Sequence, residues 1–288
     1  MLTPKLSLTG LNADRFRHPF DREATTNLKQ LPGLDFLVRS LLGPMVEDTM
    51  YMNNIASSVQ LSEQQLPDIY QLLVEASRIL DLETPQLYLK QHPAPNAYTM
   101  AMRGKKPFVV VHTSLVDLLT PAELQAVFAH ELGHLKCEHG VYLTLANIMI
   151  LTAGSLIPGL GQSIQQQMLQ WLRCAEFSCD RAALLVVQDP KVVASVLMKL
   201  SGGSPMLAPL LNVEAFLAQA RAYEEVSASE MGKAIRTAQT AQLSHPVPVL
   251  RAKEIDRWSE TNEYYSLLKS PSTGYNGKAM SEGGWRNW

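Results

Sequence analysis

The sequence predicts an α+β fold that is mainly helical, with a small sheet of three strands ahead of a long central helix. Two observations lead to this prediction. Three short stretches with alternating or β-branched residues follow one another between residues 86 and 111. From residue 120 to about residue 258, apolar residues recur mainly at helical spacing. Hydrophobic residues make up 46% of the 288 residues and charged residues 18%, so the chain can bury a large core.

The first part of the chain is expected to form a helical extension, followed by a long helix. Prolines at several positions between 4 and 44 break residues 1–60 into short segments, and apolar runs there predict small packing helices. The first clear helix is predicted over 66–82, because Pro67 suits its first turn and apolar residues recur at the spacing i, i+3, i+4, i+7. Residues 61–262 are predicted to form the main domain.

The main domain is predicted to begin with the sheet and to continue with helices. The three predicted strands are residues 86–89, 96–102 and 108–111. Thr120, Pro121 and Glu123 form a capping box that begins a helix running to about Gly140. Further helices are predicted over 166–188, 191–200, 213–223 and 247–258. Residues 271–288 contain several glycines and no periodicity, so we expect a disordered tail.

The overall charge and the cysteine count exclude several classes of protein. Lys and Arg number 25 against 27 Asp and Glu, which gives a net charge of −2. A protein that binds mainly nucleic acid is normally far more basic, so this class is disfavoured. Three cysteines exclude a disulfide scaffold and fit reduced, mostly buried thiols. The first residues resemble neither a secretory signal nor a transit peptide, so we expect an intracellular protein that is cytoplasmic or peripherally associated with a membrane.

The sharpest pattern in the sequence is His130-Glu131-Leu132-Gly133-His134, which lies inside a predicted helix. Two histidines four residues apart share one helical face, so both imidazoles can bind one metal ion. The glutamate after the first histidine reaches a metal-bound water without binding the metal itself. This is the HExxH arrangement of zinc hydrolases. The alternative is a helix with two ordinary polar histidines.

Catalytic zinc usually has three protein ligands, and Glu176 is the best candidate for the third. Glu176 and Asp180 share one face of the predicted helix 166–188, and Asp180 can accept the free N–H of a ligating histidine. Asp180 is also a weaker alternative ligand. Without a metal, both acids would be solvated or would pair with neighbouring arginines. Trp171 and Phe177 on the same helix are interpreted as core residues rather than as the lining of a substrate pocket.

Other candidates for the third ligand fit less well. His139 lies five residues after His134, about 140° around the helix, and so leaves the ligand face if the helix continues. Cys137 is closer in angle, but a thiolate ligand from the same helix is unusual. Cys174 and Cys179 are expected to be small core residues.

Four patterns together resemble the HtpX-like zinc metallopeptidases, the gluzincin group that also contains the CAAX prenyl proteases. In chain order they are Asn96-Ala97 on a strand, the HExxH pentapeptide at 130–134, Glu176 with Asp180, and Ser244-His245-Pro246 with Arg251. The resemblance covers about residues 65–258 and implies a gluzincin-like metallopeptidase domain with one zinc ion per chain. The whole chain looks most similar to a subgroup from cyanobacteria and plastids, one plastid member of which is associated with lipid droplets.

The resemblance implies roles for the residues around the metal. His130, His134 and Glu176 look like the zinc ligands, and Glu131 resembles the general base. Asp180 matches the acid that orients a ligating histidine. Zinc is the expected metal, although a set of two histidines and one glutamate also accepts cobalt or manganese.

The resemblance also implies how the substrate is held. Asn96, Ala97 and Tyr98 match the edge strand that binds the substrate backbone by strand addition. His245 resembles a histidine that helps to stabilise the oxyanion, and a simple helix-capping role is the alternative for it. Arg251 matches an arginine that supports the site.

Residues 140–172 carry no charged side chain, which raises the question of a membrane segment. A single span is excluded because His134 and Glu176 must meet at one ion, so the chain must return to the side from which it left. Two full spans need about 40 residues and a turn, more than this stretch contains. We expect a helical hairpin that packs on the domain, with peripheral membrane or lipid-droplet contact as the alternative.

The sequence therefore predicts a zinc-dependent endopeptidase that hydrolyses peptide bonds of a protein or peptide, with Glu131 as general base for a zinc-activated water. Two alternatives stay open. One is a zinc-stabilised scaffold or lipid-associated binding protein without proteolysis, and the intact Glu131 speaks against it. The other is a regulatory domain without zinc, which a measured zinc content near one per chain would exclude.

Overall fold

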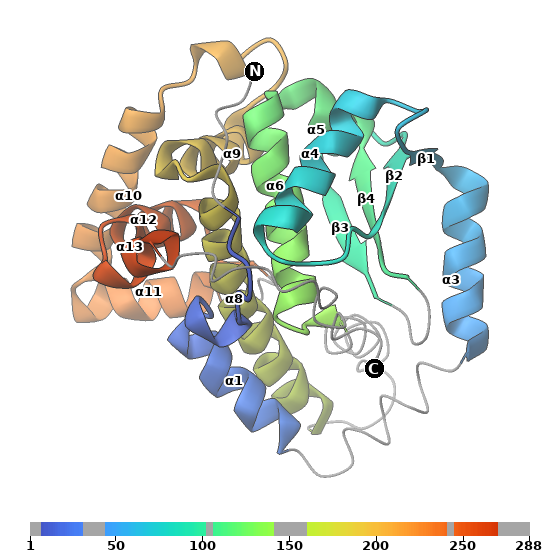
Figure 1. Ribbon diagram of the computed structural model, residues 1–288. Coiled ribbons are helices and arrows are strands. Elements are labelled where there is room, and N and C mark those ends of the chain that lie inside the picture. Colours follow the sequence, from blue (N-terminus) through green and yellow to red (C-terminus); the bar gives the residue numbers. More distant parts are fainter. Residues whose placement is uncertain (1–6, 31–43, 102–105, 141–159, 241–244, 270–288) are drawn as a thin grey trace.

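The computed structural model of the chain describes residues 7–30, 44–101, 106–140, 160–240 and 245–269 (Figure 1). The fold is α+β and mainly helical, as predicted. The helices are α1 (Pro19–Lys29), α3 (Pro44–Ser57), α4 (Pro67–Ile79), α5 (Thr113–Leu118), α6 (Pro121–Lys136), α8 (Leu160–Val187), α9 (Pro190–Gly202), α10 (Val213–Ser227), α11 (Glu230–Thr240), α12 (Pro248–Ser259) and α13 (Asn262–Lys269). The strands are β1 (Val59–Leu61), β2 (Gln86–Lys90), β3 (Ala97–Met100) and β4 (Phe108–His112).

The sheet has four strands within the described residues, in the order β1-β2-β4-β3, so the prediction of three strands was wrong. β2 and β4 run parallel, and β3 runs antiparallel to β4 with Ala97 opposite Val111. The prediction missed β1 because this strand is only three residues long and too short to show a periodic pattern. β4 is buried along its whole length, which matches its continuous apolar run.

The central helix α6 begins as the sequence predicts. The Thr120 hydroxyl accepts a hydrogen bond from the Glu123 N–H, and the Glu123 carboxylate accepts one from the Thr120 N–H. The same carboxylate accepts hydrogen bonds from Lys199 and Ser195 of α9, each at 2.6 Å. Burial opposes ionisation of Glu123, but these bonds hold its pKa below the usual value. The first turn of α6 is therefore fixed to α9.

The C-terminal end of α6 differs from the prediction, because the helix already ends at Lys136. Cys137 caps it, and Glu138 adopts the left-handed conformation with a φ of 57°. No glycine marks this turn in the sequence. The chain folds back there, and the His139 N–H donates to the His134 carbonyl at 2.9 Å. The ring of His139 consequently lies beside the ring of His134, with their centroids 5.3 Å apart.

α6 packs closely along α8 in the middle of the molecule (Figure 1). Gly133 permits this approach, since a Cβ at this position would lie 2.9 Å from the Cα of Cys179 and 3.0 Å from the Cβ of Ala182. α8 itself begins at Leu160, earlier than the predicted residue 166, and ends at Val187. The contact brings the HExxH turns of α6 against the middle of α8.

Residues that precede the sheet pack on the main domain. α1 lies along α8 (Figure 1), and the Leu8 N–H donates to the Ile79 carbonyl at 3.0 Å. Phe16 is fully buried in the same core as the apolar side chains of α6. The predicted helical extension 1–60 thus contains α1 and α3, while its boundary with a domain at 61–262 stays a prediction.

Two predictions fall wholly or partly outside the described residues. The predicted tail at 271–288 lies outside them, and of the uncharged stretch 140–172 the structure describes Gly140 and the first part of α8. In that part, Trp171 is buried and donates from Nε1 to the Thr25 hydroxyl at 2.9 Å. Among the helices that the structure describes, none combines the length and the apolar character needed to cross a bilayer.

The close approach at Gly133 generates the first prediction. Gly133→Ala should lower the free energy of unfolding by about 1–3 kcal/mol, because the added methyl group must displace the backbone of α8. Urea denaturation followed by circular dichroism measures this change. The matched control is Gly202→Ala near the end of α9, where nothing lies within 4 Å of an added Cβ, and its stability should be unchanged or slightly higher. Equal stability of the Gly133 variant and the wild type would contradict the close contact.

Candidate metal centre

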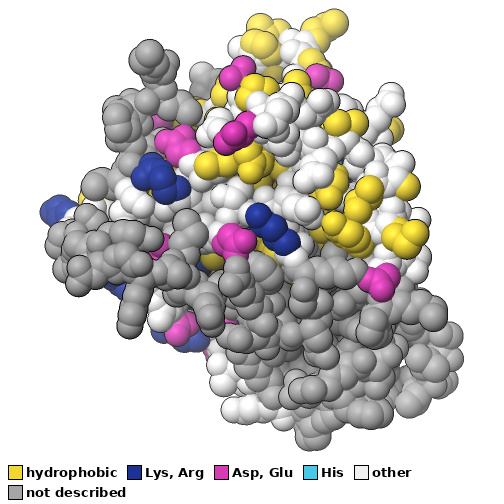
Figure 2. Space-filling view, turned by 45° about the vertical axis from the view of Figure 1, so that its right-hand side comes forward, with side chains coloured by type: hydrophobic (Ala, Val, Ile, Leu, Met, Phe, Trp, Pro, Cys, Tyr) yellow, Lys and Arg dark blue, Asp and Glu magenta, His cyan; other side chains and the backbone are white. Residues whose placement is uncertain are grey.

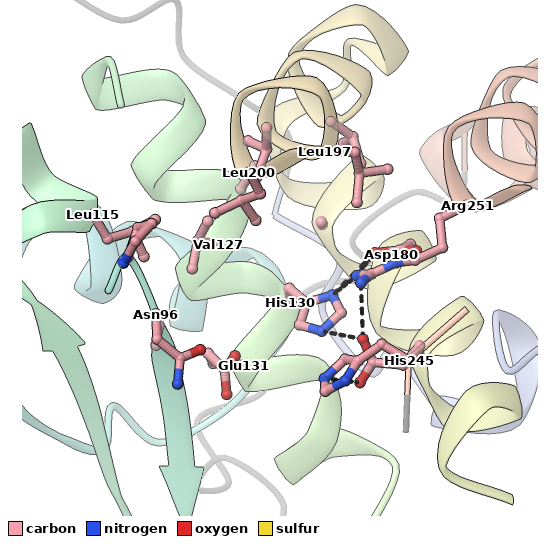
Figure 3. A pocket seen from close by; sticks show the side chains of 17 residues that line it. Asn96, Leu115, Val127, His130, Glu131, Asp180, Leu197, Leu200, His245 and Arg251 are labelled. Atoms are coloured by element: carbon pink, nitrogen blue, oxygen red, sulfur yellow. Dashed lines mark hydrogen bonds and ion pairs between the residues drawn. The ribbon is translucent and has the colours of Figure 1, made fainter. Parts of the chain in front are cut away.

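Two histidines of α6 and one glutamate of α8 meet in a cleft, and Figure 3 shows the part of it around His130. Nε2 of His130 lies 3.5 Å from Oε2 of Glu176, and Nε2 of His134 lies 3.5 Å from Oε1 of the same carboxylate. His134 and Glu176 are buried, and the side chain of His130 is 14% exposed. The structure thus brings the three predicted metal ligands together, with one nitrogen of each imidazole directed at the carboxylate.

The electrostatic surroundings of this cluster favour a cation. Burial opposes a charge on His130, yet Glu176 and Asp180 beside it raise its pKa to about 10. Burial also opposes ionisation of Glu176, but Arg251, His245 and His130 hold its pKa well below the usual value. Arg251 Nη1 lies 3.0 Å from Glu176 Oε2, but no donor among the described residues forms a hydrogen bond with that buried oxygen. A buried carboxylate with one imidazole nitrogen 3.5 Å from each of its oxygens, and with no hydrogen bond from the described residues to one of them, fits a divalent metal ion.

Asp180 and Arg251 hold His130 in place, and all three are labelled in Figure 3. Nδ1 of His130 lies 3.0 Å from Asp180 Oδ1. Arg251 on α12 donates to both oxygens of Asp180, at 2.8 and 2.7 Å. Burial works against ionisation of Asp180, but this bidentate pair keeps its pKa below the usual value. Because an ionised carboxylate only accepts, His130 donates from Nδ1 to Asp180, and Nε2, on the side of Glu176, is the nitrogen that would bind a metal ion.

The thiols near the histidines are poorer ligands than Glu176. Cys179 lies within 4.8 Å of possible ligand atoms of both His130 and His134, so distance alone allows it to bind a metal there. Burial raises the pKa of Cys179 well above its usual value, so without a metal ion it is a neutral thiol, whereas both imidazole Nε2 atoms face the ionised Glu176. Burial raises the pKa of Cys137 in the same way. We therefore favour the ionised Glu176 as the third ligand.

Glu131 lies on the side of the cleft that faces the sheet, close to Asn96 in Figure 3. Its Oε2 accepts a hydrogen bond from the Thr99 hydroxyl at 2.8 Å, and the same hydroxyl lies 3.2 Å from the Glu131 carbonyl. Sequence reasoning placed Thr99 on a strand but missed this contact. The bond ties the Glu131 carboxylate to β3 within the cleft.

The edge strand β3 forms one wall of the cleft. Among the described strands it pairs only with β4, so within the part of the chain that the structure describes one side of its backbone has no strand partner. Asn96, Ala97 and Tyr98 line the cleft together with Glu131. The Asn96 carbonyl accepts the His112 N–H at 2.9 Å, which extends the pairing with β4 by one residue before β3.

His245 lies at the open rim of the cleft. Its Nε2 is 3.7 Å from Glu176 Oε1, and its side chain is 64% exposed. The N-cap residue of the following helix α12 is Val247, so the structure gives no support to the helix-capping interpretation. The imidazole instead faces the same carboxylate as the two predicted histidine ligands (Figure 3).

The wall opposite His245 is apolar and was not predicted. Val127 of α6 and Leu197 and Leu200 of α9 line the cleft on that side of His130 (Figure 3). Further apolar side chains are exposed next to this wall in the sequence. Leu200 is 43% exposed, and the segment that follows α9 exposes Met206, Leu207 and Leu210. Figure 2 shows hydrophobic side chains at the top of the molecule, where Figure 1 places the segment between α9 and α10. Trp171, by contrast, is a buried core residue, as predicted.

Comparison with known proteins identifies relatives of the chain. The family model for peptidase family M48 matches residues 60–259. The plastoglobule-localized metallopeptidase 48, chloroplastic, of Arabidopsis thaliana is 60% identical over 270 residues, which cover 92% of this chain and 78% of that protein. The protease HtpX homolog 2 of Methanosarcina mazei is 32% identical over 169 residues, 49% of this chain and 58% of that protein. The protease HtpX homolog of Moorella thermoacetica is 27% identical over 172 residues, 50% of this chain and 58% of that protein. No solved structure gives a significant match.

The position of Arg251 between two buried carboxylates generates a second prediction. Arg251→Met should lower the free energy of unfolding of the metal-free protein by about 3–5 kcal/mol, because Glu176 and Asp180 lose their compensating charge. Excess zinc should restore part of this loss, since a bound dication offsets the same carboxylates. Urea denaturation with chelator and with zinc measures both effects.

Arg257→Met on the same helix is the control for Arg251→Met. Its guanidinium is 69% exposed and pairs with Glu254, so removing it should change stability by no more than about 1 kcal/mol. Similar losses in the two variants would contradict a compensating role of Arg251.

Proposed function

The chain belongs to peptidase family M48 and is a metalloprotease, and we propose that it is a zinc-dependent endopeptidase whose metal ligands are His130, His134 and Glu176. The observation that carries this proposal is the pair of Nε2 atoms that face the two oxygens of one carboxylate, each at 3.5 Å. Two histidines and a glutamate beside an open cleft are the usual donor set of catalytic zinc.

The residues around the ligands support a mechanism of water attack. Zinc bound by such a donor set supplies the Lewis acidity that lowers the pKa of a water and polarises a peptide carbonyl. Glu131 serves as general base: its carboxylate accepts a proton from the attacking water and passes it to the leaving amine. Thr99 keeps that carboxylate in position through its 2.8 Å hydrogen bond. His245 donates a hydrogen bond to the carbonyl oxygen as negative charge develops on it.

The substrate binds in extended form along β3. The open edge of this strand at Asn96, Ala97 and Tyr98 supports backbone pairing with a peptide, as in other strand-addition complexes. The apolar wall of Val127, Leu197 and Leu200 supports a preference for an apolar side chain next to the scissile bond.

We propose peripheral contact with a lipid surface as an additional property of the chain. Two facts support it: the name of the Arabidopsis thaliana relative locates that protein in chloroplast plastoglobules, and residues 140–172 of this chain are uncharged. The predicted location was cytoplasmic or peripherally associated with a membrane, and the same name gives no support to the cytoplasmic alternative.

Replacement of the proposed base tests the catalytic mechanism. Purified wild type and Glu131→Gln are compared for hydrolysis of casein, with zinc quantified in both preparations. We expect about one zinc per chain in each, and a loss of at least about 100-fold in rate for the variant, because Gln cannot accept the proton of the water.

Two outcomes of the casein experiment would contradict the proposal. Equal cleavage by both preparations would indicate a contaminating protease rather than this site. Zinc binding by both, with no cleavage of casein or of a pool of unstructured peptides by either, would favour a zinc-stabilised scaffold.

The apolar wall generates a prediction about specificity. The wild type should cleave peptides with Leu beside the scissile bond about tenfold better than those with Ala, and Leu200→Ala should reduce this ratio several-fold. Leu207→Ala is the control, because Leu207 is similarly exposed but does not line the cleft. Mass spectrometry of fragments from a peptide mixture measures the ratios. A wild type without preference for apolar residues would contradict this prediction.

A further inference from the structure

The two proposed histidine ligands differ in what holds their second ring nitrogen. Nδ1 of His130 faces the carboxylate of Asp180 directly, at 3.0 Å. Nδ1 of His134 faces another imidazole, because it lies 3.2 Å from Nδ1 of His139. A neutral imidazole donates from one nitrogen and accepts at the other. The role of His139 therefore depends on what holds its far nitrogen.

The far nitrogen of His139 is held by a carboxylate from near the start of the chain. Nε2 of His139 lies 3.0 Å from Oδ2 of Asp21 on α1, and both side chains are fully buried. Ser178 donates to the same oxygen at 2.6 Å, and Thr25 donates to Oδ1 at 2.9 Å. Burial opposes ionisation of Asp21, but His139, Arg17 and these hydrogen bonds hold its pKa well below the usual value. The Asp21 carboxylate is consequently charged at neutral pH.

The direction of each hydrogen bond follows from that charge. An ionised carboxylate only accepts, so His139 donates from Nε2 and carries a lone pair on Nδ1. That lone pair accepts a hydrogen bond from the Nδ1–H of His134, so the lone pair of a neutral His134 is on Nε2. This is the atom that lies 3.5 Å from Glu176. The Cys179 thiol, at 3.8 Å from Nδ1 of His139, is the weaker competing donor.

We propose that Asp21, acting through His139, fixes the tautomer and the orientation of His134, so that α1 forms part of the metal centre. Asp21 and His139 are positioning residues, because neither faces the cleft or the substrate. This inference rests on the proposed role of His134 as a ligand. Asp21 precedes the residues 60–259 that the family model matches, so this contribution comes from outside the matched region.

Several hydrogen bonds hold α1 in the register that this role requires. They are Arg17 Nη2 to the Cys137 carbonyl at 2.5 Å, the His18 N–H to Ser178 Oγ at 2.9 Å, and Trp171 Nε1 to Thr25 Oγ1 at 2.9 Å. These bonds tie the chain on both sides of Asp21 to α8 and to the end of α6. A substitution in this buried cluster will therefore also affect stability, and the experiment must separate that effect from metal binding.

Two variants of His139 separate its hydrogen bonds from its packing. His139→Phe fills the space but neither donates nor accepts, whereas His139→Gln keeps an acceptor oxygen and an N–H donor. Thr25→Val is the matched control, because it removes hydrogen bonds from the same buried cluster and leaves Oδ2 of Asp21 with His139. The zinc dissociation constant of each full-length variant is measured by chelator competition, alongside its urea midpoint without metal.

We expect His139→Phe to weaken zinc binding by about 10- to 100-fold, the usual effect of removing the partner of a ligating histidine. His139→Gln should recover most of this loss. Thr25→Val should bind zinc within about threefold of the wild type despite a lower urea midpoint. Equal zinc affinity of His139→Phe and the wild type would overturn the proposal. Equal weakening in Thr25→Val would overturn it as well, since the effect would then come from general loosening of the cluster.

A measurement on the unmodified chain decides the question if His139→Phe does not fold. Long-range ¹⁵N–¹H correlation spectra of zinc-loaded, histidine-labelled protein report which ring nitrogen carries the proton. The proposal requires a neutral His139 with its proton on Nε2 and a His134 with its proton on Nδ1. A proton on Nδ1 of His139 would overturn the proposal. A wild type that bound no zinc would be a different failure, because it would remove the metal centre itself.

Discussion

The metal centre depends on how closely α6 can approach α8. Gly133 has no side chain at the point where the two helices meet, and a methyl group there would already collide with the backbone at Cys179. The two proposed histidine ligands lie on α6 and Glu176 lies on α8. The distance between the helices therefore sets the distance from the imidazoles to the carboxylate. The capping box that joins α6 to α9 through Glu123 and Lys199 fixes the other end of the helix. Packing of these helices therefore brings the donor atoms together.

The second requirement is compensation of buried charge. Glu176 and Asp180 are placed in a low-dielectric interior by α8, and Arg251 reaches both of them from α12. An isolated buried carboxylate would be costly, but a carboxylate that faces a guanidinium and an imidazole can stay ionised. On the far side of α6, Arg17 compensates the charge of Asp21, and His139 donates a hydrogen bond to it. Each proposed histidine ligand is thus held by an ionised acid. Asp180 contacts His130 directly, and Asp21 acts on His134 through His139.

The sequence allowed prediction of those features that depend on spacing within one element. The HExxH pair, the Glu176–Asp180 pair and the cap at Thr120 are all of this kind, and the family resemblance added Asn96, His245 and Arg251. Contacts between elements left no such pattern. Thr99 and Glu131 are 32 residues apart, and Asp21 and His139 are 118 apart, so no periodicity relates them. The argument that set His139 aside assumed a continuing helix, and α6 had already ended at Lys136. The strand β1 was too short for its residues to alternate recognisably.

The insertion of α1 behind the ligands has a consequence for the order in which the chain is made. Asp21 leaves the ribosome 118 residues before His139 and 157 residues before Ser178. Arg251 in turn leaves it 121 residues after His130. At about 5–20 residues per second, α1 waits roughly 6–24 s for His139 alone. During translation the first helix therefore remains without its buried partners, and no nascent fragment that lacks α12 contains the whole constellation. Synthesis from N- to C-terminus thus delays assembly of the complete site until α12 has emerged.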